Sequence, residues 1–179
     1  MYDTSQYQSP VGELTLASDG VAITGLWMKG QKYFGYTLAG ECRSNDNAAV
    51  LALGKRWLDA YFAGRKPTLT GLPLAPVGGA FRQLVWAILM EIPYGEVRSY
   101  GAIAKEVARR MGKTSMSSQA VGGAVGHNPI GIIIPCHRVL GANGSLTGYA
   151  GGIDKKRALL RHEGVDMAGM FVPKRGTAL

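Results

Sequence analysis

A cysteine, a histidine and an arginine stand side by side at the end of an apolar stretch of this chain. Cys136, His137 and Arg138 follow the run Ile132–Pro135. The thiolate is the nucleophilic form of cysteine, and a nearby positive charge favours it. Because Pro135 stiffens the approach, the pattern predicts a rigid base that presents Cys136 as a nucleophile, with Arg138 favouring the thiolate. The alternative is a cysteine that serves only as a small buried apolar side chain.

The use of His137 as a base depends on the local backbone. Neighbouring side chains of an extended segment point to opposite sides, so His137 reaches the Cys136 sulfur only through a turn or a bridging water. A relay through water needs a third group that orients the imidazole. Glu163, at the end of a helix predicted over Asp154–His162, is the nearest candidate, and a solvated helix-end carboxylate is the alternative. With three His and no Cys-x-x-Cys pair, we expect no zinc site and no other cofactor.

The half of the chain that carries these residues predicts short helices. The first begins at Phe81, and a turn follows at Tyr94–Glu96. A second helix begins after Ser99, whose hydroxyl is placed to cap it. After the polar turn Gly112–Ser115, a third helix is predicted over Ser117–Gly126. Two helices joined by a polar turn fit a helix-turn-helix, although a small helical bundle with no DNA partner gives the same pattern.

The third of these helices carries unusually small side chains. Five of its residues leave little bulk on its surface: Ser118, Ala120, Gly122, Gly123 and Ala124. Its backbone can therefore approach something narrow, such as a DNA minor groove of about 6 Å. Close packing against another helix is the alternative.

The first half of the chain predicts a small antiparallel sheet. Three short strands are expected over Tyr2–Gln8, Glu13–Ser18 and Val21–Met28, with a tight hairpin at Asp19-Gly20. The segment Gly30–Asn45 has no sustained period, which predicts a loop with at most one irregular strand.

A helix and then a linker follow this sheet. Apolar residues recur at helical spacing from Asn47 onward, with Asp46 or Asn47 as N-cap and Gly64 as the stop signal. The Pro- and Gly-rich stretch Arg65–Ala80 predicts a domain boundary. We therefore expect an α+β N-terminal domain over 1–77 and a mainly α domain over 78–179.

Charge and composition narrow the function classes. The chain has 179 residues, 46% of them hydrophobic and 18% charged, as is typical of a globular protein. Residues 1–77 hold 7 Lys/Arg and 6 Asp/Glu, whereas residues 78–179 hold 13 and 6. This asymmetry favours a polyanionic partner, nucleic acid first, and a charge that only aids solubility is the alternative. The apolar stretches are far shorter than the roughly 20 residues of a membrane span, so we expect no membrane association and a cytoplasmic location, where cysteines stay reduced.

At this point the second half of the chain resembles a known family, the methylated-DNA protein-cysteine methyltransferases, which repair 6-O-alkylguanine. The likeness runs in order and at family-like spacing through five further motifs besides Pro135–Val139. These are Tyr94–Tyr100, Ala120–Ala124, Asn128-Pro129, Thr147–Gly152 and His162–Gly164. The first half is only consistent with the family's ribonuclease-H-like domain. For the second domain the resemblance implies a winged-helix-like helix-turn-helix.

The resemblance implies roles for residues around the cysteine. Cys136 would attack the alkyl carbon of 6-O-methylguanine, and also of 4-O-methylthymine if that base is accepted, and would keep it in a single irreversible turnover. His137 would take the Cys136 proton through water while Glu163 holds the imidazole, and Tyr100 would donate to the leaving oxygen. The remaining residues are structural or line the pocket: Asn128 would brace the turn, and Val139, Tyr149 and Ala150 would line or close the alkyl pocket.

The same resemblance implies that the partner is double-stranded DNA that contains alkylated guanine. It also implies that the protein binds this DNA as a monomer and needs no protein partner. The target base would be rotated out of the duplex, and the helix from Ser117 would lie in the minor groove. The implied DNA contacts are Ser117, Ser118, Gln119, Ala120, Gly122 and Arg138. Gln119 stands where the family commonly has an arginine that fills the gap left by the rotated base.

Two other function classes compete with a DNA alkyltransferase. A damage-sensing binding module would look similar, but its relatives replace the reactive cysteine, which is present here as Cys136. A Cys-His hydrolase would need an oxyanion hole, which no feature of the sequence specifically supports.

Overall fold

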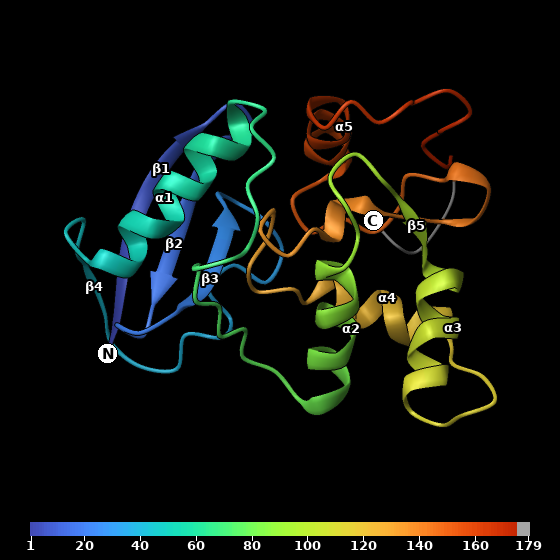
Figure 1. The fold of residues 1–179 in the computed structure, drawn as a ribbon, viewed down its shortest axis with the longest axis horizontal. Helices are drawn as coiled ribbons and strands as arrows, with labels where there is room; N and C mark the ends of the chain where they lie inside the picture. Colours follow the sequence, from blue (N-terminus) through green and yellow to red (C-terminus); the bar gives the residue numbers. More distant parts are fainter. Residues whose placement is uncertain (175–179) are drawn as a thin grey trace. The chain divides into compact units, whose positions relative to one another are not determined.

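The computed structural model describes residues 1–174. The chain forms two compact units, one of residues 1–78 together with 129–133, the other of residues 79–128 together with the chain from 134 onward (Figure 1). The first is a sheet covered by a helix and the second is mainly helical. The expected fold class is therefore confirmed.

The sheet of the first unit has four strands. The three predicted strands are confirmed, and a short parallel strand pairs with the first of them, so the order is β3-β2-β1-β4. Nearly every residue of β2 and β3 is buried, so these two strands form much of the core of the unit. The bounds are β1 Tyr2–Ser9, β2 Gly12–Ser18, β3 Ile23–Met28 and β4 Cys42–Ser44.

The predicted tight hairpin at Asp19-Gly20 is wrong. Ser18 pairs with Ile23, so four residues form the loop between β2 and β3. The Asp19 carboxylate accepts hydrogen bonds from the backbone N–H groups of Val21 and Ala22, at 2.9 and 2.8 Å. These bonds close a wider loop than a two-residue turn, as is common for Asp side chains.

One helix, α1 (Ala49–Phe62), packs on the sheet (Figure 1). Its close approach requires Gly54, because a Cβ atom there would lie 2.7 Å from the side chains of Ile23 and Leu16. The predicted N-caps at positions 46 and 47 are wrong: the cap residue is Ala48, and no side chain caps the helix. The carboxylate of Asp46 is engaged elsewhere, with the Ser5 hydroxyl and with Lys55 at 3.0 Å.

The apolar run before the cysteine is divided between the two units. Residues 129–133 lie beside β3, where Leu26 N–H donates to Pro129 at 2.8 Å and Gly131 N–H donates to Leu26 at 2.9 Å. Ile132 has φ +66°, a conformation that is strained for a β-branched residue. From Ile134 onward the chain belongs to the second unit.

The second unit contains the two helices of a helix-turn-helix. Ser99 caps α3 as predicted, its hydroxyl accepting from Ala102 N–H at 3.1 Å, and Ser117 caps α4. The indole of Trp86 on α2 donates to the carbonyl of Ala124 at 2.9 Å and so fixes α4 against α2. The bounds are α2 Ala80–Met90, β5 Arg98–Ser99, α3 Tyr100–Arg110, α4 Ser118–Gly126, the short helix η1 Cys136–Arg138, β6 Val139–Leu140, the short helix η2 Ala142–Gly144 and α5 Ile153–His162.

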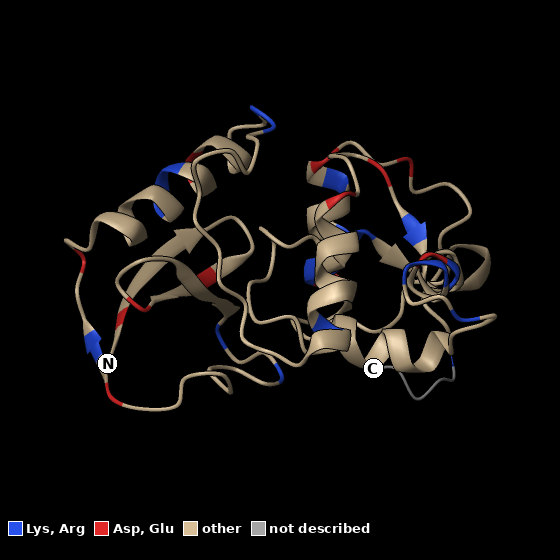
Figure 2. Ribbon diagram, turned by 60° about the horizontal axis from the view of Figure 1, so that its bottom comes forward, with Lys and Arg blue, Asp and Glu red and all other residues tan. Residues whose placement is uncertain are grey.

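Charged residues are distributed unevenly over this unit. Lys and Arg lie on α2, α3 and α5, whereas α4 has no charged residue (Figure 2).

Within residues 1–174, no helix is both long and apolar enough to cross a membrane.

Candidate functional site

Cys136 opens a tight helical turn rather than continuing an extended strand. Cys136, His137 and Arg138 form η1, and the Cys136 N–H donates to the carbonyl of Ile134 at 2.8 Å. Of the two possibilities that the sequence left open at this point, a turn or a bridging water, the backbone forms the turn. Cys136 is buried, with 7% of its surface exposed, and His137 is fully buried.

His137 is paired with Glu163, as the sequence suggested. The two side chains meet at 2.6 Å between Nε2 and Oε1, and neither is exposed to solvent. Burial lowers the pKa of His137 despite the neighbouring carboxylate, so the imidazole is neutral at pH 7. A neutral ring that donates from Nε2 leaves Nδ1 as an acceptor, and Nδ1 has no hydrogen-bond partner among residues 1–174. The imidazole is thus held in the form that can accept a proton.

Glu163 is the centre of a larger buried cluster. Its carboxylate also accepts from Arg138 Nε at 2.8 Å, from Arg138 Nη2 at 3.0 Å and from Gly95 N–H at 3.1 Å. Burial opposes ionisation, but the hydrogen bonds from His137 and Arg138 outweigh it and hold the pKa of Glu163 well below its usual range. The alternative of a solvated helix-end carboxylate is therefore wrong.

Arg138 does not lie where its two predicted roles require. It is 8% exposed, its third nitrogen Nη1 donates to the carbonyl of Ile92 at 2.6 Å, and its guanidinium lies 5.7 Å from the centre of the Tyr94 ring. With its donors directed inward, it is not available to a DNA phosphate. Its charge is paired with Glu163 rather than with the Cys136 sulfur. The contact that the sequence predicted between Arg138 and DNA does not agree with this placement.

The cation that acts on the cysteine is Lys156, which sequence reasoning missed. Its ammonium is buried and donates to the carbonyls of Val139 at 2.5 Å and Thr147 at 2.7 Å. Burial lowers the pKa of Lys156 to about 8, against the attraction of Cys136. A signal was present in the sequence, because Lys156 lies three and four residues before Leu159 and Leu160 and so shares the buried face of α5.

The thiol of Cys136 is under opposing influences. Burial raises its pKa, whereas a hydrogen bond from Asn128, the charge of Lys156 and the backbone N–H groups of Cys136 and His137 lower it. Burial is the largest of these, so the pKa of Cys136 stands above its ordinary value and the resting group is a thiol. A base that removes the proton is therefore needed.

Asn128 and Tyr100 lie in the same unit as the cysteine. Asn128 is buried and donates from Nδ2 to the carbonyl of Ile134 at 2.7 Å, which braces the chain two residues before Cys136. Tyr100, the first residue of α3, donates from its hydroxyl to the carbonyl of Gly148 at 3.2 Å. Burial raises the pKa of Tyr100, with the charge of Cys136 adding to the effect, so its hydroxyl keeps its proton.

The residues predicted to line the alkyl pocket and those predicted to contact DNA differ in exposure. Val139 is fully buried in β6, and Tyr149 and Ala150 are half-buried in the segment that leads to α5. Burial raises the pKa of Tyr149 well above its ordinary value, with smaller contributions from the charges of Cys136 and Glu163. At the start of α4, four consecutive residues are exposed and Gly122 lies beside the Tyr100 ring. The four exposed residues are Ser117, Ser118, Gln119 and Ala120.

Two family models match the chain and between them cover most of it. Residues 3–76 match the ribonuclease-like domain of 6-O-methylguanine DNA methyltransferase. Residues 80–165 match the DNA binding domain of the same family.

Individual relatives agree with the family models. The chain is 44% identical over 161 residues to a methylated-DNA–protein-cysteine methyltransferase of Methanosarcina acetivorans, covering 88% of this chain and 96% of the relative. It is 40% identical to the protein of that name from Haemophilus influenzae, covering 88% and 83%. Among solved structures, that of Mycobacterium tuberculosis OGT in complex with DNA superposes with a TM-score of 0.76 at 45% identity, covering 90% of this chain and 92% of the other. The chain therefore belongs to the 6-O-methylguanine DNA methyltransferase family.

Proposed function

We propose that this protein repairs DNA by transferring the methyl group of 6-O-methylguanine irreversibly to the sulfur of Cys136. The S–C bond forms as the C–O bond breaks, and the electron pair of that bond stays on the guanine oxygen. The observation that carries the proposal is the buried pair of His137 and Glu163, whose Nε2 and Oε1 atoms lie 2.6 Å apart. His137 directly follows the cysteine in the chain. Because the thioether is stable, each molecule acts once.

The cluster supports a specific division of labour. A water between Cys136 and His137 carries the thiol proton to Nδ1 of the neutral imidazole, and Glu163 stabilises the imidazolium that forms. Lys156 stabilises the thiolate. Tyr100, which keeps its proton, donates a hydrogen bond to the guanine oxygen as negative charge develops there.

The substrate base reaches the cysteine from double-stranded DNA. The base is rotated out of the duplex at a cost of a few kcal/mol. The exposed start of α4, with Ser117, Ser118, Gln119 and Ala120, lies in the minor groove, and Gly122 permits close approach of its backbone. Val139, Tyr149 and Ala150 then line or close the pocket around the extruded base. 4-O-methylthymine, whose methyl group has the same chemistry, is a second candidate substrate.

The two domains and the compartment follow from this chemistry. We propose a sheet-plus-helix domain over residues 1–77 and a second domain over residues 78–179 that holds every residue assigned a role, with its segment 129–133 packed in the first unit. A thiol that reacts once must stay reduced until it meets its substrate, and both cysteines of the chain are free thiols. These features favour the cytoplasm, which keeps thiols reduced.

Intact-mass measurement tests the proposed function. After incubation with a duplex oligonucleotide that contains 6-O-methylguanine, we expect the chain to gain one methyl group, located on the peptide that bears Cys136. Cys136→Ala should gain none and should still bind DNA, whereas Cys42→Ala, at the exposed cysteine, should react as the unchanged protein does. Repeated turnover, or a methyl group on Cys42, would contradict the mechanism. Binding without any gain in mass would indicate a damage-sensing module.

A further inference from the structure

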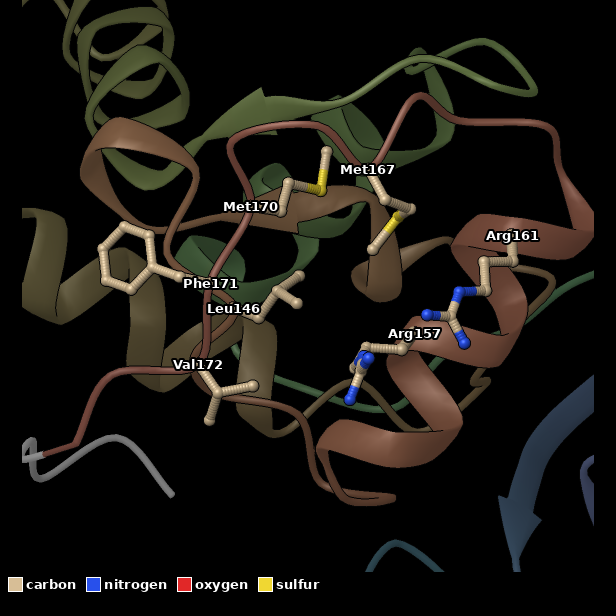
Figure 3. Close-up of a pocket in the computed structure, with 7 residues that line it drawn as sticks. All are labelled: Leu146, Arg157, Arg161, Met167, Met170, Phe171 and Val172. Atoms are coloured by element: carbon tan, nitrogen blue, oxygen red, sulfur yellow. The ribbon is translucent and has the colours of Figure 1, made fainter.

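A cavity lies in the C-terminal part of the helical unit, apart from the residues assigned to methyl transfer. It has a volume of about 290 Å³ and is lined by residues of α5 and of the two segments that flank it (Figure 3). Two of the lining residues, Arg157 and Arg161, come from α5, and the other five are apolar. The apolar residues are Leu146, Met167, Met170, Phe171 and Val172.

The two arginines have no partner among the residues that the structure describes. Within residues 1–174, neither guanidinium makes a hydrogen bond or an ion pair, whereas Arg109, Arg110 and Arg138 are each paired with a glutamate. Arg157 and Arg161 are one helical turn apart, so their like charges lie on the same face of α5 and repel each other. Both side chains are directed to the same side of the helix, beside Met167 (Figure 3). Such a pair matches the two oxygens of a carboxylate or a phosphate.

The rest of the lining is apolar and partly exposed. Phe171 and Val172 are 49% and 43% exposed at the rim. Met167 and Met170 pack on a small core of Leu140, Leu146 and Leu160, and methionine side chains adapt readily to the shape of an apolar ligand. The cavity therefore combines a double positive charge with an apolar wall.

The walls are held in place by backbone hydrogen bonds rather than being assembled by a ligand. Leu146 N–H donates to the carbonyl of Phe171 at 2.8 Å, and Phe171 N–H donates to that of Gly144 at 3.3 Å. Met170 N–H donates to the carbonyl of Met167 at 3.1 Å, which closes a turn. A site that is already formed loses less entropy when it binds a ligand.

We propose that this cavity is a binding site for a carboxylate or phosphate group carried directly on one apolar chain or ring. Arg157 and Arg161 hold the anionic group, and the apolar part lies against Met167, Met170 and Leu146. The volume is at the low end for ligand sites and suits one such group rather than an extended surface. The same chemistry is offered by a free aryl or alkyl acid and by the C-terminal residue of a peptide.

Titration of the uniformly ¹⁵N-labelled protein, followed by two-dimensional NMR, tests this site. With 4-phenylbutyrate we expect saturable shifts of the backbone signals of Leu146 and of residues 167–172. 4-Phenylbutanamide, which lacks the negative charge, and acetate, which lacks the phenylalkyl chain, should each bind at least tenfold more weakly than 4-phenylbutyrate. A short peptide that ends in a free leucine carboxylate, compared with its C-terminal amide, shows whether a polypeptide end is accepted as well as a free acid.

Variants assign the binding to the two arginines. The double change Arg157→Gln with Arg161→Gln should weaken 4-phenylbutyrate binding at least tenfold. The matched control, Arg56→Gln with Arg65→Gln, removes the same charge from exposed positions of the other unit and should leave binding unchanged. The proposal would be overturned if the unchanged protein bound 4-phenylbutyrate and 4-phenylbutanamide equally well. It would also be overturned if the two double variants weakened 4-phenylbutyrate binding equally. Displacement of the ligand by undamaged duplex DNA would also overturn it, since the arginines would then belong to a phosphate-binding surface.

Discussion

At the scale of single residues, the reactivity of Cys136 is decided by a balance between burial and a few neighbouring groups. Burial alone would leave the thiol protonated and inert. Asn128 and Lys156 act in the opposite direction, and burial keeps His137 neutral, the form that can accept a proton. The charge that matters for the thiolate is therefore that of a buried lysine, not that of the arginine two residues away in the sequence.

Replacement of Lys156 by methionine should slow methyl transfer about tenfold at pH 7. The reason is that losing the Lys156 charge raises the pKa of Cys136, and a rise of about one unit lowers the thiolate fraction about tenfold. The pKa of Lys156 is about 8, so the charge is present below that pH and is lost above it. The methyl-transfer rate of the unchanged protein divided by that of Lys156→Met should therefore fall towards one as the pH rises past 8. Single-turnover rates across pH 6.5 to 9.5 measure this.

Lys155→Met is the matched control for that experiment, because it removes the same charge one residue earlier. A ratio that stays constant across the pH range would mean that Lys156 acts only by holding the carbonyls of Val139 and Thr147.

Glu163→Gln should lower the free energy of unfolding by about 3 kcal/mol at pH 7, because it breaks a buried ion pair with Arg138 and weakens the bond to His137. The pKa of Glu163 is lower in the folded state than its unfolded value near 4.5. Its stabilising contribution is thus complete above about pH 4.5 and is lost as the pH falls through the folded-state pKa. Urea unfolding at several pH values should show a constant difference between pH 5 and 7 and a shrinking one below pH 4.5. Glu106→Gln, at an exposed ion pair, should have a much smaller effect, and an equal loss in both variants would argue against the buried cluster.

At the scale of elements, α4 combines an exposed end with a fixed opposite side. The hydroxyl of Ser117 caps the helix by accepting from the N–H groups of Gln119 and Ala120, and the Trp86 indole fixes the carbonyl of Ala124. The exposed start of the helix is therefore presented on a rigid support. This geometry favours a role for Gln119 in the space that an extruded base leaves.

Gln119→Arg should speed repair of a methylated duplex and leave the reaction with free 6-O-methylguanine nearly unchanged. An arginine fills more volume, stacks its guanidinium on neighbouring bases and adds a positive charge, all of which stabilise the extruded state, whereas the free base needs no extrusion. Gln119→Gly should slow duplex repair and spare the free base. Rates with the two substrates measure this, and an equal shift for both would place residue 119 in the chemistry or in folding.

At the scale of the whole molecule, the excess of positive charge on residues 78–179 is only partly available to a partner. Arg138 and Lys156 are buried, and Arg109 and Arg110 are paired with Glu106 and Glu91. Of the 13 Lys and Arg residues in this half, at most nine remain for phosphates. The net charge of the sequence therefore overstates the electrostatic contact with DNA.

Binding of undamaged duplex should weaken as salt rises and should depend little on sequence. The slope of log affinity against log salt should be no steeper than about −8, because each phosphate neutralised contributes about −0.9. Fluorescence titrations between low and moderate salt measure the slope. Affinity that does not change with salt would show that this half of the chain does not contact phosphates.

The sequence by itself determined the elements that depend on neighbouring residues. The three strands of the first unit, the Ser99 cap and the α3–α4 pair were predictable because alternation, helical spacing and capping act over a few residues. Cys136 as nucleophile and Glu163 as partner of His137 were also expected from residue type and from the family motif. Only the tertiary structure decided that Arg138 turns inward to Glu163, that Lys156 is the cation influencing the thiol, and that residues 129–133 lie beside β3. These outcomes depend on burial and on partners 9 to 103 residues away in the sequence, such as the Lys156–Thr147 bond and the Leu26–Pro129 bond, and no local pattern encodes such contacts.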